Sequence, residues 1–180
     1  MSRKLDLFDR IQLEEPVALN LRGAVYTSQR DYDKATLYFN KAIHAAPGYF
    51  APRFNLGEVL FQQQHYAEAR AKFEELTEND KGSELLQFKI FLTYLMEGDK
   101  DHARIRMDQM KFPSDTPAYY FARASWAFRA GNPAEGRDWI ESSMRIFGPE
   151  RNEFFVESLS DLGWISKDQY RNTNAEIPGS

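Results

Sequence analysis

The chain has 180 residues, of which 42% are hydrophobic and 28% charged, and its net charge is −4. This length suits one domain or a short repeat array and is sufficient to bury a core. The acidic balance, with lysines and arginines interleaved among acids, excludes the basic footprint that nucleic acids or anionic membrane surfaces require. The chain contains no cysteine, which excludes disulfides, thiol catalysis and thiolate zinc sites.

The sequence also predicts a compartment. No apolar run approaches the roughly 18 residues needed to span a bilayer. The first ten residues, MSRKLDLFDR, are too highly charged for a secretory signal. We therefore expect a cytoplasmic protein without membrane insertion. An exported or periplasmic location stays open if a signal has been removed upstream.

The first element, residues 1–15, echoes a later part of the chain. Phe8, Ile11 and Pro16 have the same three- and five-residue spacing as Phe39, Ala42 and Pro47. The echo is shifted by three residues from the main repeat described next. Residues 3–13 are therefore either the second helix of an incomplete earlier repeat or an N-terminal cap, and the spacing leaves both alternatives open.

Residues 16–149 carry an internal repeat with a period of about 34 residues, which is typical of stacked helix pairs. Four pairs of identical residues share this spacing: Gly23 and Gly57, Tyr32 and Tyr66, Ala35 and Ala69, Phe39 and Phe73. A third copy keeps the phase through Ala103, one period after Ala69. A fourth follows at Gly136, one position short of a further period. The sequence thus predicts four consecutive copies of one unit.

Helix start signals divide each copy into two helices. Asp31, Asp99 and Asn132 are predicted N-caps of second helices, and Asn132 is followed by a proline in the favoured first helical position. Thr116-Pro117 is predicted to open the fourth pair in the same way. The predicted helix pairs span residues 16–46, 50–79, 84–111 and 117–147.

These residues resemble the tetratricopeptide repeat, in which small and large apolar positions let two antiparallel helices nest. The matching residues of the first copy are Gly23, Tyr26, Ala35, Phe39, Ala42 and Pro47. The resemblance implies an all-α fold, a right-handed superhelical solenoid of antiparallel helix pairs with repeats at about 16–49, 50–83, 84–116 and 117–149. Two departures stand out: Lys81 replaces the closing proline of the second copy, and Phe91 replaces the glycine of the third.

A last amphipathic stretch, residues 150–165, follows the repeats. Phe155, Leu159 and Leu162 are spaced i, i+4, i+7, as on one helix face. Since a solenoid exposes the apolar side of its last repeat, we expect this stretch to be a capping helix, in preference to a ligand-binding helix. Residues 166–180 are predicted to form a flexible tail.

The sequence offers no catalytic, metal or cofactor site. His44, His65 and His102 lie in three different repeats and lack any two-ligand helical spacing. The acidic cluster of Glu74, Glu75, Glu78 and Asp80 lacks the alternating ligands of a calcium loop, so a solvated helix face is the better interpretation. We therefore expect a protein that is not an enzyme and binds no cofactor.

The resemblance also implies where a partner would bind, because first helices line the inner wall of tetratricopeptide arrays. The inward positions of repeats two to four are mostly apolar, and the predicted partner-binding groove is lined by Phe54, Phe61, Leu85, Phe88, Leu92, Leu95, Phe121 and Phe128. Packing between repeats is the alternative explanation for these side chains. Of the groups that would clamp a C-terminal carboxylate, only Asn55 and Lys89 are present, so an apolar helix or extended segment is the expected ligand.

The predicted function is a non-catalytic protein–protein interaction module or scaffold whose partner is another polypeptide. Two alternatives stay open. One is a homo-oligomer, in which the groove accepts the N-terminal segment with Leu5, Phe8 and Ile11 from a neighbouring copy. The other is a small chaperone of a secretion or assembly system.

Overall fold

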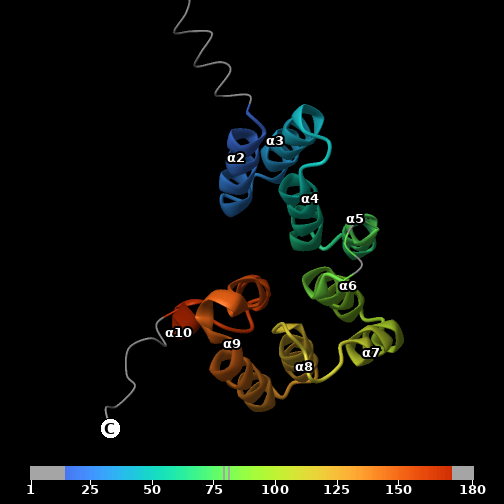
Figure 1. Ribbon diagram of the computed structural model, residues 1–180, viewed down its shortest axis with the longest axis vertical. Helices are drawn as coiled ribbons and strands as arrows, with labels where there is room; N and C mark the ends of the chain where they lie inside the picture. Colours follow the sequence, from blue (N-terminus) through green and yellow to red (C-terminus); the bar gives the residue numbers. More distant parts are fainter. Residues whose placement is uncertain (1–14, 79, 81, 172–180) are drawn as a thin grey trace, which may run out of the picture. The chain divides into compact units, whose positions relative to one another are not determined.

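The structure is a computed structural model that describes residues 15–78, 80 and 82–171. Throughout these ranges the regular secondary structure is α-helical (Figure 1). The helices are α2 (Pro16–Ser28), α3 (Tyr32–Ala45), α4 (Phe50–Gln62), α5 (Tyr66–Thr77), α6 (Glu84–Glu97), α7 (Lys100–Gln109), α8 (Ala118–Arg129), α9 (Pro133–Asp161) and α10 (Asp168–Arg171).

The prediction of an all-α fold built from antiparallel helix pairs is confirmed. The predicted helix starts also agree with the structure. The carboxylate of Asp31 accepts from the backbone N–H of Lys34 at 3.2 Å, and that of Asp99 accepts from His102 at 3.1 Å. The Asn132 side chain accepts from the N–H of Glu135 at 3.4 Å. Each cap satisfies a donor that the first helical turn leaves without a partner.

Two helix starts differ in detail from the prediction. Ser83 caps α6 by accepting from the N–H of Leu86, a cap that the sequence analysis did not identify. At the fourth pair, Pro117 precedes α8, and the Thr116 hydroxyl accepts from the N–H of Ala118 at 3.4 Å. The helix therefore begins one residue later than Thr116-Pro117 suggested.

The chain divides into two compact units, Met1–Lys81 and Gly82–Ser180, each of which is described by itself. In the first unit, α2 pairs with α3 and α4 with α5, and α3 also contacts α4. In the second unit, α6 pairs with α7 and α8 with α9, and α6 also contacts α8. Both units therefore repeat one design, in which a helix pair stacks on the next.

The glycines that recur in the first two repeats are required because a phenylalanine ring packs against the backbone at each of them. A Cβ atom at Gly23 would stand 2.4 Å from the ring of Phe39, and one at Gly57 would stand 2.6 Å from the ring of Phe73. These distances are far inside van der Waals contact, so only glycine fits. The repeat spacing between Gly and Phe thus records a side chain of one helix packed on the backbone of its partner.

In the third and fourth copies, side chains of other sizes occupy the two positions that hold glycine and phenylalanine in the first two copies. Phe91 replaces the glycine in the third copy, and Met107 replaces the phenylalanine; both are buried. In the fourth copy the two positions hold Ala124 and Ile140, which are fully buried. A larger residue on one helix is matched by a smaller or more flexible one on its partner, which lets the pair pack without the glycine.

Helix α9 contains a sharp kink that turns its second half back over the second unit (Figure 1). Gly148, with φ 73° and ψ 171°, interrupts the helical backbone, and Pro149 follows it. Positive φ at this point favours glycine because a Cβ would clash with the backbone. The two halves, residues 133–147 and 149–161, match the predicted fourth second helix and the predicted terminal stretch.

The predicted terminal segments fall partly outside the described residues. The prediction for residues 3–13 lies outside them, as do residues 172–180 of the predicted tail. Residues 168–171 form the short helix α10, and Tyr170 is buried. Helical structure therefore extends beyond the predicted end of the folded part at residue 165.

Candidate interaction surfaces

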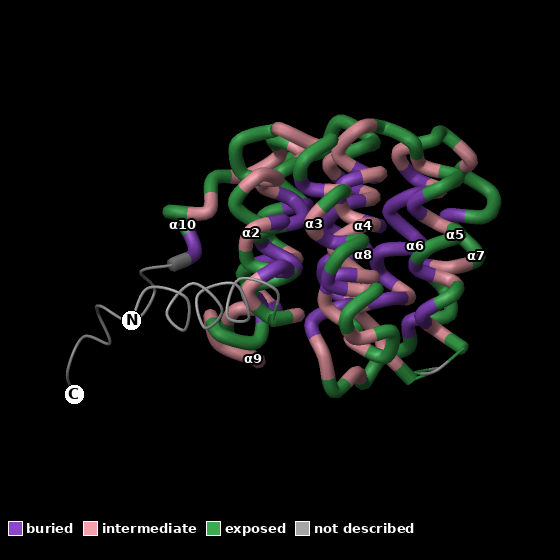
Figure 2. The backbone as a smooth tube through the Cα atoms, turned by 90° about the horizontal axis from the view of Figure 1, so that it is seen from above, coloured by how far each residue is buried: buried purple, intermediate pink, exposed green. Residues whose placement is uncertain are grey.

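The predicted groove residues of the second unit are buried. Phe88, Leu92 and Phe121 have no exposed surface, and Leu95 is almost fully covered. Long buried stretches of this kind run along α6 and α8 (Figure 2). The prediction that these four side chains line an open wall does not agree with the structure, because they form part of the core. The alternative of structural packing describes them correctly.

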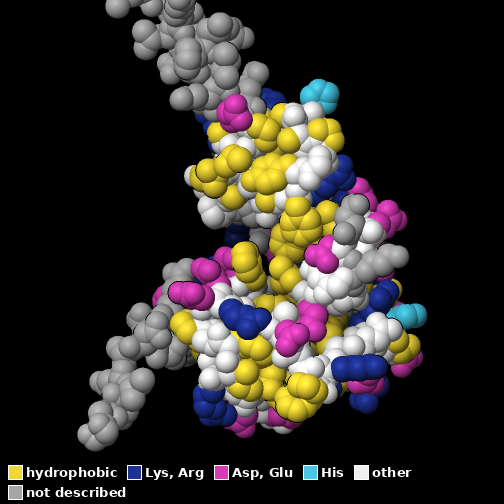
Figure 3. Space-filling model, in the orientation of Figure 1, with side chains coloured by type: hydrophobic (Ala, Val, Ile, Leu, Met, Phe, Trp, Pro, Cys, Tyr) yellow, Lys and Arg dark blue, Asp and Glu magenta, His cyan; other side chains and the backbone are white. Residues whose placement is uncertain are grey.

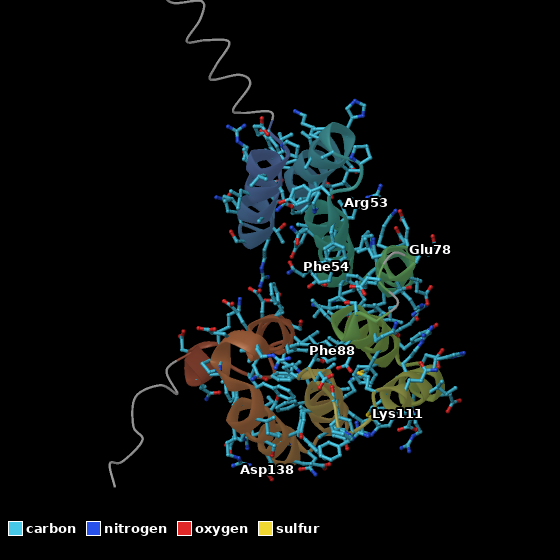
Figure 4. The ribbon with its side chains drawn as sticks, viewed as in Figure 1. Arg53, Phe54, Glu78, Phe88, Lys111 and Asp138 are labelled. Atoms are coloured by element: carbon cyan, nitrogen blue, oxygen red, sulfur yellow. The ribbon has the colours of Figure 1, made fainter. Side chains whose placement is uncertain are left out.

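The cover over this wall is the second half of α9. The ring of Phe155 lies 5.1 Å from that of Phe88 and 5.3 Å from that of Phe121, centroid to centroid. Phe88 and Phe121 are themselves 6.5 Å apart with their planes nearly perpendicular. Phe155 thus contacts both rings, and Figure 4 labels one of them, Phe88, on α6. The wall does hold an apolar helix, and that helix belongs to the same chain.

A buried polar network fixes this helix in place. The Ser143 hydroxyl donates to the side-chain oxygen of Asn152 at 2.6 Å, and both residues are fully buried. The Asn152 amide donates to the carbonyl of Gly148 at 2.5 Å, which ties the network to the kink. Lifting the helix away would exchange these hydrogen bonds for bonds to water, a net loss of about 0.5–1.5 kcal/mol each, in addition to exposing its apolar side. The second half of α9 therefore packs as part of the core of the second unit.

In the first unit, one predicted groove residue is buried and one is partly buried. Phe61 is buried, with its ring edge-on to Tyr66 at 5.3 Å. Phe54, labelled on α4 in Figure 4, packs on the buried ring of Phe73 at 5.5 Å. On its other side it stacks with Phe50 at 5.8 Å, and Phe50 is 44% exposed. The pair of Phe50 and Phe54, the α4 aromatic pair, thus presents a ring to solvent while resting on the core.

The two remaining members of the predicted groove, Leu85 and Phe128, are partly buried in the second unit. Phe128 stacks on Trp164 with ring centres 5.7 Å apart. A Cβ atom at Gly136 would stand only 2.7 Å from the Phe128 ring, so this ring also packs on the backbone of α9. Phe128 therefore fills the space between α8 and α9, the two helices of the fourth pair. The structure does not bring the eight predicted residues together as one open surface.

An exposed apolar stripe on α2 was not identified by the sequence analysis. Val17, Leu21 and Val25 are each more than half exposed and lie at i, i+4, i+8, on one face of the helix. Figure 3 shows hydrophobic side chains over α2 and α4 on the visible face of the first unit. The spacing of these three residues is a signal that could have revealed the stripe.

The second unit carries an aromatic surface that was also missed. The guanidinium of Arg123 lies 3.6 Å from the centre of the Tyr119 ring and 6.0 Å from that of Trp139. Phe112, which is largely exposed, packs against Tyr119 at 5.6 Å. Cation–π contacts of this type hold an arginine in one orientation. No repeat spacing marks these residues, since they come from a loop and two helices.

The histidines and acidic residues that the sequence singled out lie on the surface or pair locally. The three histidines are exposed, and His102 pairs with its own N-cap, Asp99, at 2.7 Å. No group of three or more His, Cys, Asp or Glu residues within these ranges could hold a metal ion. Nor does any helix there have the length and apolar character needed to cross a membrane.

One cavity of about 270 Å³ lies at the C-terminal end of the second unit. Its wall includes Glu153, Glu157, Lys167 and Tyr170, and Glu157 pairs with Lys167 at 2.5 Å. Burial raises the pKa of Tyr170, and the nearby Glu141 raises it further. The phenol is therefore kept in its neutral form, in which it can donate or accept a hydrogen bond in this cavity.

The paired helices and their glycine–phenylalanine contacts define an all-α helical-repeat protein. Residues 26–89 match the family model of the tetratricopeptide repeat. A crystal structure of a tetratricopeptide repeat protein from Parabacteroides merdae ATCC 43184 resembles the chain with 19% identity and a TM-score of 0.61, over 87% of this chain and 68% of that one. Residues 26–89 therefore match the tetratricopeptide repeat that the spacing predicted, and the solved structure shares the fold.

Further comparisons add no argument. The structure of Naa15/Naa10 bound to HypK-THB matches with 13% identity and a TM-score of 0.45, over 86% of this chain and 25% of that one. A search of curated proteins gave no match. The tetratricopeptide repeat indicates, in general, a protein-interaction scaffold.

Proposed function

We propose that this protein is a non-catalytic scaffold that binds an apolar helix or extended segment of another polypeptide on its first unit. The observation that carries the proposal is the α4 aromatic pair. Phe50 offers an exposed ring, and Phe54 beneath it joins that ring to the buried Phe73. Phe54 is also a predicted groove residue of the first unit.

Side-chain contacts join the start of α4 to its neighbours, which favours binding at this position. The Nε of Arg53 donates to the carbonyl of Pro47 at 2.9 Å, and its guanidinium also donates to Glu75 at 2.7 Å. These contacts fix the turn before α4 and the helix's first residue, Phe50. A surface that is already ordered loses less conformational entropy when a partner binds. Aromatic anchors on such surfaces often supply much of the binding energy.

The chemistry of the surface points to an apolar partner. Phenylalanine has no polar group to match, so it favours an aliphatic or aromatic side chain that packs against the ring face. The neighbouring Arg53 pairs with Glu75, which Lys72 also contacts, so these charges are engaged with one another. A helix that presents apolar residues one turn apart would place one on Phe50 and the next on Phe54.

The proposal can be tested with a displayed library of short random peptides, selected on the full chain and measured by fluorescence anisotropy. We expect selected peptides to be apolar, and Phe50→Ala to weaken their binding by about fivefold or more, since loss of an anchor commonly exceeds about 1 kcal/mol. Leu37→Ala is the matched control, because Leu37 is a comparably exposed apolar residue on α3 of the same unit. Equal affinities for both variants, or a library that yields no binder, would refute the proposed site.

A further inference from the structure

The apolar stripe of α2, formed by Val17, Leu21 and Val25, lacks a cover that the next repeat possesses. Val25 and Val59 occupy the same position of successive repeats, one period apart. Val25 is 54% exposed, whereas Val59 is 1% exposed. The two first helices therefore differ in what packs on this face.

The cover over Val59 comes from the helix that directly precedes it. Ala35 and Phe39 of α3 form one buried cluster with Val59 of α4. Since α3 and α4 are antiparallel neighbours joined by a short turn, the helix before a first helix supplies the side chains that bury it. The same position on α2 would require a helix that ends just before Pro16.

The chain has a suitable segment at this place. Shifting the Phe39–Val59 pair back by one repeat period gives Leu5 and Val25, and one turn nearer the connection Phe8 falls opposite Leu21. The apolar residues of the segment thus meet the apolar residues of α2 when the two run antiparallel. We propose that residues 3–13 form a helix that docks on the α2 stripe of the same molecule and acts as the N-terminal cap of the repeats.

The connection favours docking within one molecule over docking between two copies. Only Glu14 and Glu15 separate the segment from α2, which matches the two- to five-residue turns of antiparallel helix hairpins. Such a short link raises the effective concentration of the segment at α2 to the millimolar range. A second copy would compete only at protein concentrations of that order. This surface is separate from the α4 aromatic pair, so the inference does not depend on the proposed function.

Cysteine cross-linking of the full chain tests the inference, because the natural sequence has no cysteine to interfere. In the double variant Phe8→Cys with Leu21→Cys, the two Cβ atoms should come within the roughly 4 Å that a disulfide requires. We expect oxidation by copper–phenanthroline in air to close an intramolecular disulfide, seen as a faster-migrating monomer on a non-reducing gel. The control is Arg10→Cys with Leu21→Cys, since residue 10 lies on the opposite side of a helix from residue 8.

The rates distinguish the outcomes. Docking in the proposed register predicts closure at least about tenfold faster for the Phe8 pair than for the Arg10 pair. Equal rates for both pairs would overturn the inference, because an undocked segment would not favour either position. A disulfide-linked dimer formed on mixing the two single variants, Phe8→Cys and Leu21→Cys, would also overturn it and would assign the stripe to a second copy.

Discussion

The replacement of Phe155 by alanine tests whether the inner wall of the second unit is core or binding surface. In the structure, Phe155 lies between Phe88 and Phe121, and each contact is an aromatic pair with ring centres 5.1 and 5.3 Å apart. The variant Phe155→Ala would leave a cavity bordered by two rings that are already fully buried. These rings belong to helices packed on other helices, which limits their ability to collapse into the space.

The expected loss follows from the packing. A buried phenylalanine replaced by alanine commonly costs about 3–5 kcal/mol, which includes lost transfer energy and the cavity. The two aromatic contacts place this site in the upper part of that range, because each such pair adds roughly 0.5–1.5 kcal/mol beyond area burial. Phe154 offers a matched control: it is the adjacent residue of the same helix, 58% exposed against 5% for Phe155. Phe154→Ala should change stability by less than about 0.5 kcal/mol.

The chain provides its own probe for this measurement. Its three tryptophans, Trp126, Trp139 and Trp164, all lie in the second unit. Urea unfolding followed by tryptophan fluorescence therefore reports on the unit that contains the substitution. We expect a lower midpoint for Phe155→Ala at an unchanged slope. A loss below about 1 kcal/mol, or equal losses for Phe154→Ala and Phe155→Ala, would refute the assignment of this wall to the core.

Three further predictions concern packing, charge and the kink. Gly57→Ala should destabilise the first unit by about 1–3 kcal/mol, because the new Cβ would lie 2.6 Å from the ring of Phe73. The control Gly48→Ala should not destabilise it, because open space surrounds that position. Thermal unfolding followed by circular dichroism compares the two variants. Asp31→Asn should lower the melting temperature at pH 7, because hydrogen bonds from Lys34 hold the pKa of Asp31 below its ordinary 3.8. The difference in melting temperature from the natural chain should shrink as the pH falls through that lowered pKa. A difference that persists in acid would contradict this prediction. Ser143→Ala should cost about 1–3 kcal/mol by depriving buried Asn152 of its donor, whereas Ser142→Ala, on the outer side of α9, should be nearly neutral in the same urea assay.

The sequence contained enough information for the helices and little for the surfaces between them. The spacing of Gly23 and Gly57 from Phe39 and Phe73 reflects one contact, a ring packed on a backbone, and this contact recurs with the repeat. Helix starts were equally accessible, because a cap such as Asp31 satisfies a donor within the first turn of its own helix. Local and repeated interactions leave a periodic trace in a single sequence. Interactions between distant segments do not.

The predicted groove shows the limit. The apolar faces of α6 and α8 were recognised, but a face that binds a foreign helix and one that binds the chain's own helix have the same pattern. Phe155 was correctly placed on the apolar side of a terminal helix, yet its spacing could not show that it reaches Phe88, which lies two repeats earlier in the chain. The kink at Gly148, which aims the helix at that wall, depends on backbone geometry that one glycine does not reveal.

The contrast between equivalent residues restricts the proposed binding surface to a smaller part of the molecule than the fold alone does. Phe54, Phe88 and Phe121 hold the same position in three repeats, but Phe88 and Phe121 are sealed around Phe155, whereas Phe54 stacks on the exposed Phe50. A partner that bound the sealed wall would first have to displace Phe155 and break the Ser143–Asn152 bond. It would thus spend several kcal/mol before making its first contact, which lowers affinity by about a thousandfold or more. A partner at Phe50 meets no such barrier, and the first unit is for this reason the proposed binding surface.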